Sequence, residues 1–191
     1  MSTEQSKAQD VMTAASILRP TGADSARAGG VYSVECRDAA GNLKWADTFH
    51  NLVVNEGLQD MNSKYFAGSG YTAAWFLGLV TGPGSGTTFA AADTLASHAG
   101  WTENTNYTGN RKAVTFGTAT TADPSVITNS AAPSVFTMNA NAQTIAGAFL
   151  CSVSSGTSGV LFSAGDFTGG DKIVDSGDTL SVTYQFSLDA A

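Results

Sequence analysis

The chain is divided into short runs of β-branched and aromatic residues, and Gly, Asn, Asp or Pro separates each run from the next. These runs recur about every 8–12 residues, which is the spacing typical of an antiparallel sandwich or barrel. None approaches the roughly 20 apolar residues that a membrane-spanning helix needs. We therefore expect an all-β fold: an antiparallel, jelly-roll-like β-sandwich with one short helix and an extended N-terminal arm.

The clearest of these runs predict a β-hairpin. Residues 31–37 and 43–49 alternate between apolar and polar side chains, and the turn-forming sequence Asp-Ala-Ala-Gly-Asn lies between them. Alternation with a period of two is typical of a strand that has one buried face. Tyr32, Val34 and Cys36 share one face of the first strand, so we expect them in the core.

Three other segments have a recognisable pattern. Residues 55–66 carry apolar side chains at helical spacing and predict the helix, with Asn55 as its N-terminal cap, although Gly57 weakens it. Residues 73–80 form the most apolar run and predict a central strand buried on both faces. Residues 180–188 alternate cleanly and predict a strand whose apolar face points inward. Further strands are expected at 111–117, 125–129, 134–138, 143–153 and 159–163.

Residues 1–29 differ from the rest of the chain. They contain no aromatic side chain and lead into Arg27-Ala28-Gly29-Gly30, which we interpret as a flexible hinge. We therefore divide the chain into a flexible N-terminal arm, residues 1–29, and a β-sandwich domain, residues 30–191. The arm is either disordered in isolation, as terminal segments commonly are, or it orders when an apolar patch binds a groove on a partner. The expected anchors of this patch are Val11, Met12, Ile17 and Leu18.

Charged residues are scarce, and they limit the chemistry that the chain can perform. Only 13% of the residues are Asp, Glu, Lys or Arg, and the formal net charge is −7. Because binding to phosphates or anionic lipids needs clustered Lys and Arg, we expect neither nucleic acid nor a membrane as partner. His50 and His98 are the two histidines, and we interpret both as packed or surface residues. We therefore expect a structural or binding protein, not an enzyme, and no cofactor.

Neither the cysteines nor the aspartates predict a metal site. Cys36 and Cys151 lie far apart in apolar runs, so small buried side chains are favoured over zinc ligands, and their pairing is left open. An aspartate-rich segment, residues 166–178, has a spacing that matches no EF-hand loop, so ordinary turn chemistry is favoured over calcium binding. Its aspartates are Asp166, Asp171, Asp175 and Asp178.

Aromatic side chains offer the one candidate recognition surface, because aromatic faces stack on carbohydrates. Tyr71 and Trp75 belong to this group, but Trp75 lies in the most apolar run and is expected in the core. Trp101 and Tyr107 lie in a polar, turn-rich region, so they are the candidates for surface recognition.

Several sequence blocks together resemble small virion proteins of tailed bacteriophages. The blocks are Val-Glu-Cys-Arg-Asp-Ala-Ala-Gly-Asn-Leu-Lys-Trp (34–45), His-Asn-Leu-Val (50–53), Glu-Gly-Leu (56–58), residues 75–80 with 93–103, residues 130–136, and residues 176–184. The likeness extends over most of residues 31–188, and residues 1–29 lie outside it. It implies a structural component of the virion, assembled in the cytoplasm of a bacterial host, with no catalytic residues to carry over.

Within a virion we expect a capsid decoration (cement) protein, which binds the outer surface of the phage head and stabilises the capsid lattice. Its partner would be the major capsid protein. A homo-oligomer is expected and a trimer is favoured, since several arms could then reach neighbouring capsid subunits and multiply a weak affinity through avidity. The alternative is a head-fibre or tail/adaptor component with a receptor- or glycan-binding role.

Overall fold

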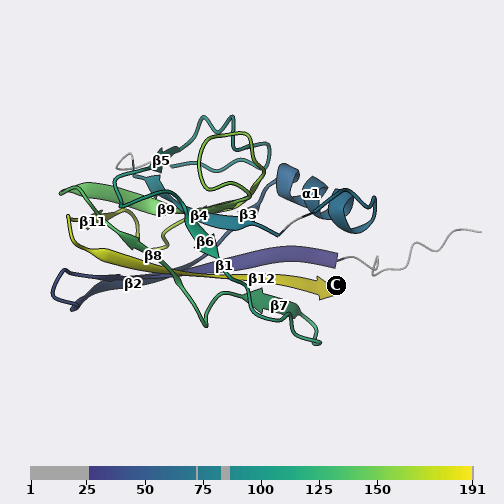
Figure 1. The fold of residues 1–191 in the computed structure, drawn as a ribbon, viewed down its shortest axis with the longest axis horizontal. Coiled ribbons are helices and arrows are strands. Elements are labelled where there is room, and N and C mark those ends of the chain that lie inside the picture. Colours follow the sequence, from purple (N-terminus) through teal and green to yellow (C-terminus); the bar gives the residue numbers. More distant parts are fainter. Residues whose placement is uncertain (1–25, 72, 83–86, 191) are drawn as a thin grey trace, which may run out of the picture.

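The structure is a computed structural model that describes residues 26–71, 73–82 and 87–190. Two antiparallel β-sheets face each other, and one helix lies at an end of the pair (Figure 1). The elements are β1 (Ala26–Arg37), β2 (Leu43–His50), β3 (Leu52–Val53), α1 (Asn55–Tyr65), β4 (Trp75–Thr81), β5 (Thr102–Asn104), β6 (Lys112–Val114), β7 (Ser125–Thr128), β8 (Ser134–Thr137), β9 (Gln143–Cys151), β10 (Leu161–Asp166), β11 (Lys172–Val174) and β12 (Thr179–Ala190).

The first sheet is built around β1 and β12, which pair antiparallel from Ala26↔Ala190 to Arg37↔Thr179. We call this pair the β1–β12 ribbon. β2 continues the sheet on the outer side of β1, as the predicted hairpin requires. On the far side of β12, β8 pairs with its first half and β7 with its second half. Both chain ends of the described residues therefore lie side by side at one end of the ribbon.

The second sheet has the order β3-β10-β9-β4-β5, with β11 paired to β9 and β6 paired to β4. β4 is buried from Leu77 to Val80, which confirms the predicted strand, but it begins at Trp75, and Ala73 and Ala74 precede it and are exposed. The all-β class, the two antiparallel sheets and the helix are confirmed.

Alternation explains why the two sheets stack. Tyr32, Val34 and Cys36 of β1 are buried as predicted, and they face the second sheet together with Leu180, Val182 and Tyr184 of β12. Intervening side chains of the same strands are partly exposed. Burial of one face in each sheet is what holds a sandwich together, because the apolar area removed from water scales with the stabilisation.

A second apolar cluster covers the outer face of the second sheet. Its buried members include Val80, Phe149 and Cys151 from the sheet, and Leu95 and Trp101 from the segment between β4 and β5. The segment from residue 87 to residue 101 therefore acts as a third layer over β4 and β9. This layer decides which aromatic side chains reach the surface.

Helix α1 lies at the predicted position, but its N-terminal cap and the exposure of its apolar face differ from the prediction. Its N-cap is Val54, which makes no side-chain capping bond, so the expectation that Asn55 caps the helix is wrong. The expected apolar face is largely exposed: Leu58, Tyr65 and Phe66 point away from the core. α1, the helix of the described part of the chain, is not long and apolar enough to cross a membrane.

Gly57, which weakens the helix in sequence terms, is the residue that lets α1 dock. A Cβ at this position would lie 2.5 Å from the carbonyl oxygen of Phe162, so only glycine allows α1 to lie directly against β10. Glu56 strengthens the same junction, because its Oε2 accepts a 2.8 Å hydrogen bond from the backbone N–H of Leu161. The contact with β10, more than an apolar helix face, positions α1.

The expected boundary between arm and domain is wrong in one respect. Residues 26–29, assigned to a flexible arm, form the start of β1 and pair with residues 187–190 of β12. Gly30 also lies within β1, paired with Phe186, and glycine fits there because a Cβ would lie 2.7 Å from the hydroxyl oxygen of Tyr184. The expected anchors of the arm, namely Val11, Met12, Ile17 and Leu18, lie outside the described residues.

Replacing Gly57 by alanine tests the docking of α1. In a solvent-facing helix this change raises stability by about 1 kcal/mol, but here the new methyl group would press on the backbone of β10. We expect Gly57→Ala to lower the free energy of unfolding by about 1–3 kcal/mol, measured by urea denaturation. Asn62→Ala, at an exposed position of the same helix, should leave stability unchanged or slightly raised. Equal stabilisation by both changes would contradict the close contact.

Candidate functional site

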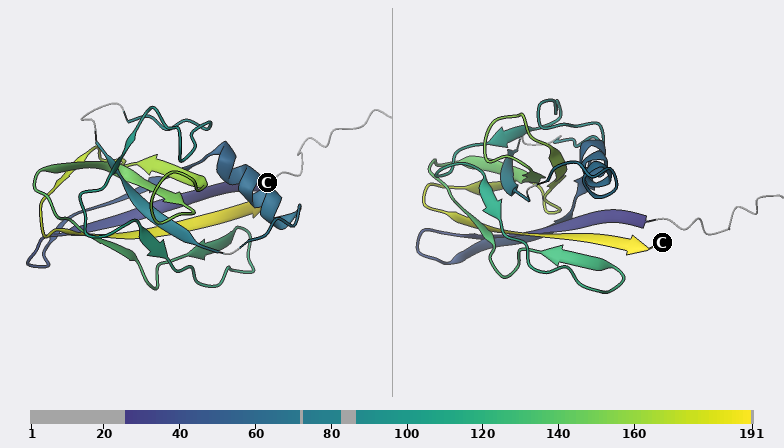
Figure 2. Two further views of the ribbon diagram at one scale, coloured as in Figure 1. Left: turned by 45° about the horizontal axis from the view of Figure 1, so that its top comes forward. Right: turned by 45° about the vertical axis from the view of Figure 1, so that its right-hand side comes forward.

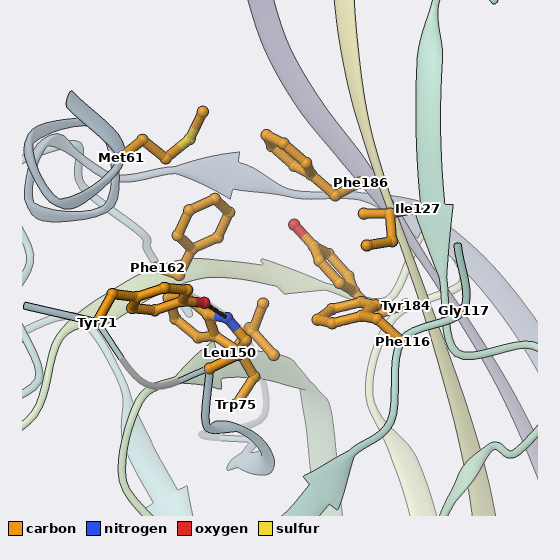
Figure 3. A pocket seen from close by; sticks show the side chains of 11 residues that line it. Met61, Tyr71, Trp75, Phe116, Gly117, Ile127, Leu150, Phe162, Tyr184 and Phe186 are labelled. Atoms are coloured by element: carbon orange, nitrogen blue, oxygen red, sulfur yellow. Dashed lines mark hydrogen bonds between the residues drawn. The ribbon is translucent and has the colours of Figure 1, made fainter. Parts of the chain in front are cut away.

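An open cavity of about 400 Å³ lies between the two sheets at the end where α1 is docked. Figure 3 shows side chains converging on it from α1, from the second sheet and from the outer half of β12. Met61, Trp75, Phe116, Ile127, Phe162 and Phe186 are among its lining residues. The cavity is concave and lined mainly by apolar side chains, so it is the candidate site.

The cavity exists because the two sheets differ in length at this end. In the second sheet, β4 begins at Trp75, and Phe76 pairs with Cys151, the last residue of β9. In the first sheet, β12 continues past Tyr184 to Ala190, and β7 pairs with this outer part. Side chains of the longer sheet therefore have no strand opposite them, and only α1 and the segment before β4 close the gap in part.

Aromatic rings form the walls of the cavity in edge-to-face contact. The rings of Trp75 and Phe162 meet at a centroid distance of 5.2 Å, and those of Phe162 and Phe186 meet at 5.3 Å. Such contacts add to the energy of area burial and fix ring orientation. The walls are therefore preorganised, and the apolar surface is held open instead of collapsing.

Polar atoms at the floor of the cavity are bonded within the protein. The hydroxyl of Tyr184 accepts a 2.9 Å hydrogen bond from Nδ2 of Asn51 and lies 3.3 Å from Oγ of Ser163. Ser163 also bonds the hydroxyl of Tyr32 at 2.8 Å, which ties the two sheets together. Burial raises the pKa of Tyr184 and of Tyr32 far from neutrality, so both hydroxyls stay protonated. The floor offers no ionised group to an occupant.

Tyr71 stands at the mouth of the cavity and is the most exposed aromatic residue of its lining. Its hydroxyl accepts a 2.9 Å hydrogen bond from Nε1 of Trp75, and Nζ of Lys64 lies 5.6 Å from its ring centroid. Lys64 is held in turn by the carbonyl oxygen of Gly70. Lys64 is also paired with Asp60 at 3.8 Å, so the mouth combines an apolar rim with a neutralised ion pair and suits an apolar side chain or a small apolar molecule.

The sequence-based candidates for surface recognition do not lie at this site. Trp101 and Tyr107 are only 5% and 3% exposed, so the expectation that they form a recognition surface is wrong. Trp101 packs beneath the third layer, against Phe149, and its Nε1 donates to Asp93. Tyr107 packs edge-to-face on Phe136 in the core between the sheets. A polar stretch of sequence surrounds both residues, but it covers them instead of exposing them.

Of the four aromatic residues considered from the sequence, Trp75 and Tyr71, which were ranked lower, are the two that line the site. Trp75 starts its strand and is half-buried, so its position in an apolar run gave a misleading indication of full burial. Phe116, Ile127 and Phe162 were not singled out at all. No motif marks them, because they meet only through the unequal lengths of the two sheets.

The cysteines and histidines considered from the sequence do not line the cavity. Cys36 and Cys151 are free and buried, as expected for small apolar side chains. His98 stacks on Trp101 at 3.8 Å, and His50 is exposed at the end of β2. Among residues 26–71, 73–82 and 87–190, no group of three or more His, Cys, Asp or Glu side chains is placed to hold a metal ion.

Two of the four aspartates of segment 166–178 stabilise the turn before β12. Asp178 is buried and accepts from Nζ of Lys44 at 2.6 Å and from the backbone N–H of Asp175 at 2.8 Å. Asp175 accepts from the backbone N–H of Ala142, which lowers its pKa together with Lys44. These contacts are turn and ion-pair chemistry, the reading favoured for these residues over calcium binding.

A buried arginine, Arg111, makes a bidentate ion pair with Glu103. Nε and Nη2 of Arg111 donate to the two carboxylate oxygens of Glu103 at 2.8 Å and 2.7 Å. Nη1 donates to the carbonyl oxygens of Val153 and Gly156, and the guanidinium lies 5.2 Å from the ring centroid of Phe149. Arg111 therefore joins the segment after β5 to the loop after β9, and its role is architectural.

The chain matches no protein-family model, no curated protein and no solved structure.

The two thiols provide a test of burial. Burial raises the pKa of Cys36 to about 11, with a further contribution from the charge of Asp178, and burial also raises the pKa of Cys151. Both thiols are therefore protonated at pH 8 and out of contact with solvent. We expect neither to react with Ellman's reagent in the native protein and both to react in guanidinium chloride. Rapid reaction of one thiol in the native state would contradict its buried position.

Substitution of Arg111 tests the bidentate contact. Lysine keeps the charge but cannot serve both oxygens of Glu103 and the two carbonyl groups at once. We expect Arg111→Lys to lower the free energy of unfolding by about 2–3 kcal/mol in a denaturation experiment. The control is Arg37→Lys, because Arg37 pairs with Glu35 on the surface and should change stability by less than about 0.5 kcal/mol. Similar effects at both positions would refute the role given to Arg111.

Proposed function

We propose that this chain is a structural protein of a tailed-bacteriophage virion, and specifically a capsid decoration protein on the outer surface of the head. In this proposal the jelly-roll-like sandwich is a rigid body that binds the major capsid protein as a homo-oligomer, with a trimer favoured. The resemblance of residues 31–188 to small virion proteins supports it. The proposal assigns no catalytic step to the chain.

The observation that carries the proposal is the placement of the chain ends. The β1–β12 ribbon brings the start of β1 and the end of β12 to one end of the sandwich (Figure 2). α1 lies at the same end and exposes Tyr65 and Phe66, which are 83% and 80% exposed. Exposed aromatic residues gathered at one end are typical of an interaction surface. We call this end of the molecule, with α1, Tyr71 and the tip of the ribbon, the docking end.

A docking end of this kind suits repeated, weak attachment to a lattice. The sandwich supplies stiffness, because the ring contact of Phe162 with Phe186 and the hydrogen bond between Tyr32 and Ser163 join the two sheets. Residues 1–25 supply additional length for contact with a neighbouring subunit. Oligomeric display multiplies a modest affinity per subunit, provided that all copies reach their sites simultaneously.

A head-fibre or tail/adaptor role with glycan binding is the second candidate, and one observation favours it. Tyr71 and Trp75 form a hydrogen-bonded aromatic pair at the mouth of an open cavity. Aromatic faces at such a position could stack on a sugar ring. In this second candidate the recognition residues are Tyr71 and Trp75, because Trp101 and Tyr107 are buried.

Co-sedimentation with undecorated phage heads tests the proposal. The full-length protein should bind in a saturable way, with a fixed number of copies per head. Tyr65→Ser/Phe66→Ser removes exposed apolar surface at the docking end, and we expect it to weaken binding at least tenfold without altering the melting temperature. The control is Val135→Ser, because Val135 is an exposed apolar residue on β8, away from α1.

The outcomes separate the candidates. Saturable binding that is lost in the aromatic variant and kept in the control supports a decoration protein. Absence of binding by the full-length protein would refute decoration of the heads used. If heads are not bound but cell-surface glycans are, and Tyr71→Ala abolishes that binding, then the second candidate replaces the first.

A further inference from the structure

The tip of the β1–β12 ribbon has an inner face with no strand of the second sheet opposite it. Gly30 and Ala28 of β1 pair with Phe186 and Leu188 of β12, and all four continue the face that carries Tyr32 and Tyr184 in the core. Phe186 is partly buried in the cavity wall, but Leu188 is 39% exposed. An apolar face therefore extends outward from the cavity to Ala26.

The shape of this face leaves room for a chain segment. Its β1 side has only small residues, with Ala26 and Ala28 alternating up to Gly30, while Leu188 stands beside them on β12. β7 borders the far side, where Ile127 pairs with Phe186. We call the cavity together with this outward extension the ribbon groove. It begins beneath Trp75 and ends where residue 26 continues toward the N-terminus.

The chain that enters at Ala26 contains one apolar patch in an otherwise polar sequence. Ile17 and Leu18 form its nearer half, and Val11 and Met12 form its farther half. Leu18 lies eight residues before Ala26, and eight residues span up to about 26 Å at ~3.3 Å per residue. The cavity wall at Gly30 and Phe186 lies only four residues along the strand, or about 13 Å, from Ala26.

Between the patch and Ala26 the sequence permits a reversal of direction. Residues 19–25 include Pro20 and Gly22, which are residues that favour turns. The segment that connects the patch to Ala26 is therefore long enough for the patch to reach the ribbon groove. The patch is also apolar, as an occupant of this groove must be. A separate molecule would have to compete with a segment that is covalently held at the mouth of the groove, where its effective concentration is in the millimolar range.

We infer that the apolar patch of residues 11–18 binds the ribbon groove of its own chain, with Ile17 and Leu18 packed against Phe186, Leu188 and Met61. This contact covers the apolar inner face that the shorter second sheet leaves open. It goes beyond the proposed function, because it concerns the isolated protein and holds whatever the partner is. On a capsid, the same residues become available for a neighbour only after they leave the groove.

Disulfide trapping tests the contact in the full-length protein. Ser16→Cys/Ser125→Cys places one thiol beside Ile17 and one at the rim of the groove, where Ser125 pairs with Leu188, and it leaves the apolar side chains in place. Mild oxidation should give a cross-linked monomer, identified by mass spectrometry of peptides. The native thiols of Cys36 and Cys151 are buried and do not interfere.

The matched control uses the opposite end of the ribbon. Ser16→Cys/Ser176→Cys places the second thiol in the turn before β12, about 36 Å from Ala26 along the ribbon. Residue 16 is attached ten residues before Ala26 and would have to be almost fully extended, at ~3.3–3.6 Å per residue, to reach this turn, so an intramolecular cross-link should form there far less than at Ser125. Cross-linked monomer in the first pair but not in the second supports the inference.

A methionine-methyl NMR spectrum gives an independent measurement. Ile17→Asp/Leu18→Asp in the full chain should shift the methyl signal of Met61, which lines the cavity, and leave that of Met138 unchanged, because Met138 is buried in the core between the sheets. Thr3→Asp/Ser6→Asp adds the same charge outside the patch and should shift neither signal.

Each contrary result overturns the inference. Covalent dimers in place of cross-linked monomers would assign the groove to the segment of a second copy. No cross-link above the control, with an unshifted Met61 signal, would show that the patch does not occupy the groove. Failure to bind phage heads would leave this inference intact, because both measurements are made on the isolated protein.

Discussion

Pairing of the first and last strands of the described chain is the constraint on which the fold depends. β1 and β12 lie in register from Ala26↔Ala190 to Arg37↔Thr179, and every other strand of the first sheet joins one of these two. Tyr32 and Tyr184, a cross-strand pair on the ribbon, reach the second sheet through Ser163. The ribbon thus aligns the first sheet and links it to the second.

Because the two sheets differ in length, the pairing of β1 with β12 also produces the cavity. The ribbon continues past the last rows of β4, β9 and β10, and its inner side chains then face α1 instead of a strand. α1 cannot fill the space, because Gly57 fixes it against the backbone of β10 and most of its apolar side chains point outward. The cavity is therefore a direct consequence of the architecture and does not need a dedicated set of polar residues.

Local periodicity made most of the fold predictable. Alternation identified the hairpin of β1 and β2 and the strand β12, since each has one face in the core and one face in contact with solvent. The apolar run of residues 73–80 correctly identified a central strand. Where β1 begins could not be read in the same way, because Ala26–Gly29 carry a weak pattern and their pairing depends on residues 187–190, far away in sequence.

The site was harder to predict from the sequence. The burial of a side chain there depends on which segment covers its strand, and the periodicity of the strand itself does not reveal this. Trp101 lies in a polar stretch, but the segment from residue 87 to residue 101 folds back over the second sheet and buries it. Trp75 lies in an apolar stretch, but it occupies the first position of its strand, where it borders the open cavity instead of a filled core. Sequence patterns report which side of a strand is apolar; they do not report what covers that side.

The pairing of β1 with β12 also sets the order of events during synthesis on the ribosome. The hairpin of β1 and β2 emerges early, and an isolated two-stranded hairpin is at best marginally stable in water. Its apolar face, with Tyr32, Val34 and Cys36, cannot be completed until β12 has been translated about 140 residues later. The nascent chain must therefore carry an unfinished sheet edge while the residues between β1 and β12 are synthesised. The charged side chains of Glu35, Arg37 and Lys44 on this hairpin give that edge some protection against pairing with another chain.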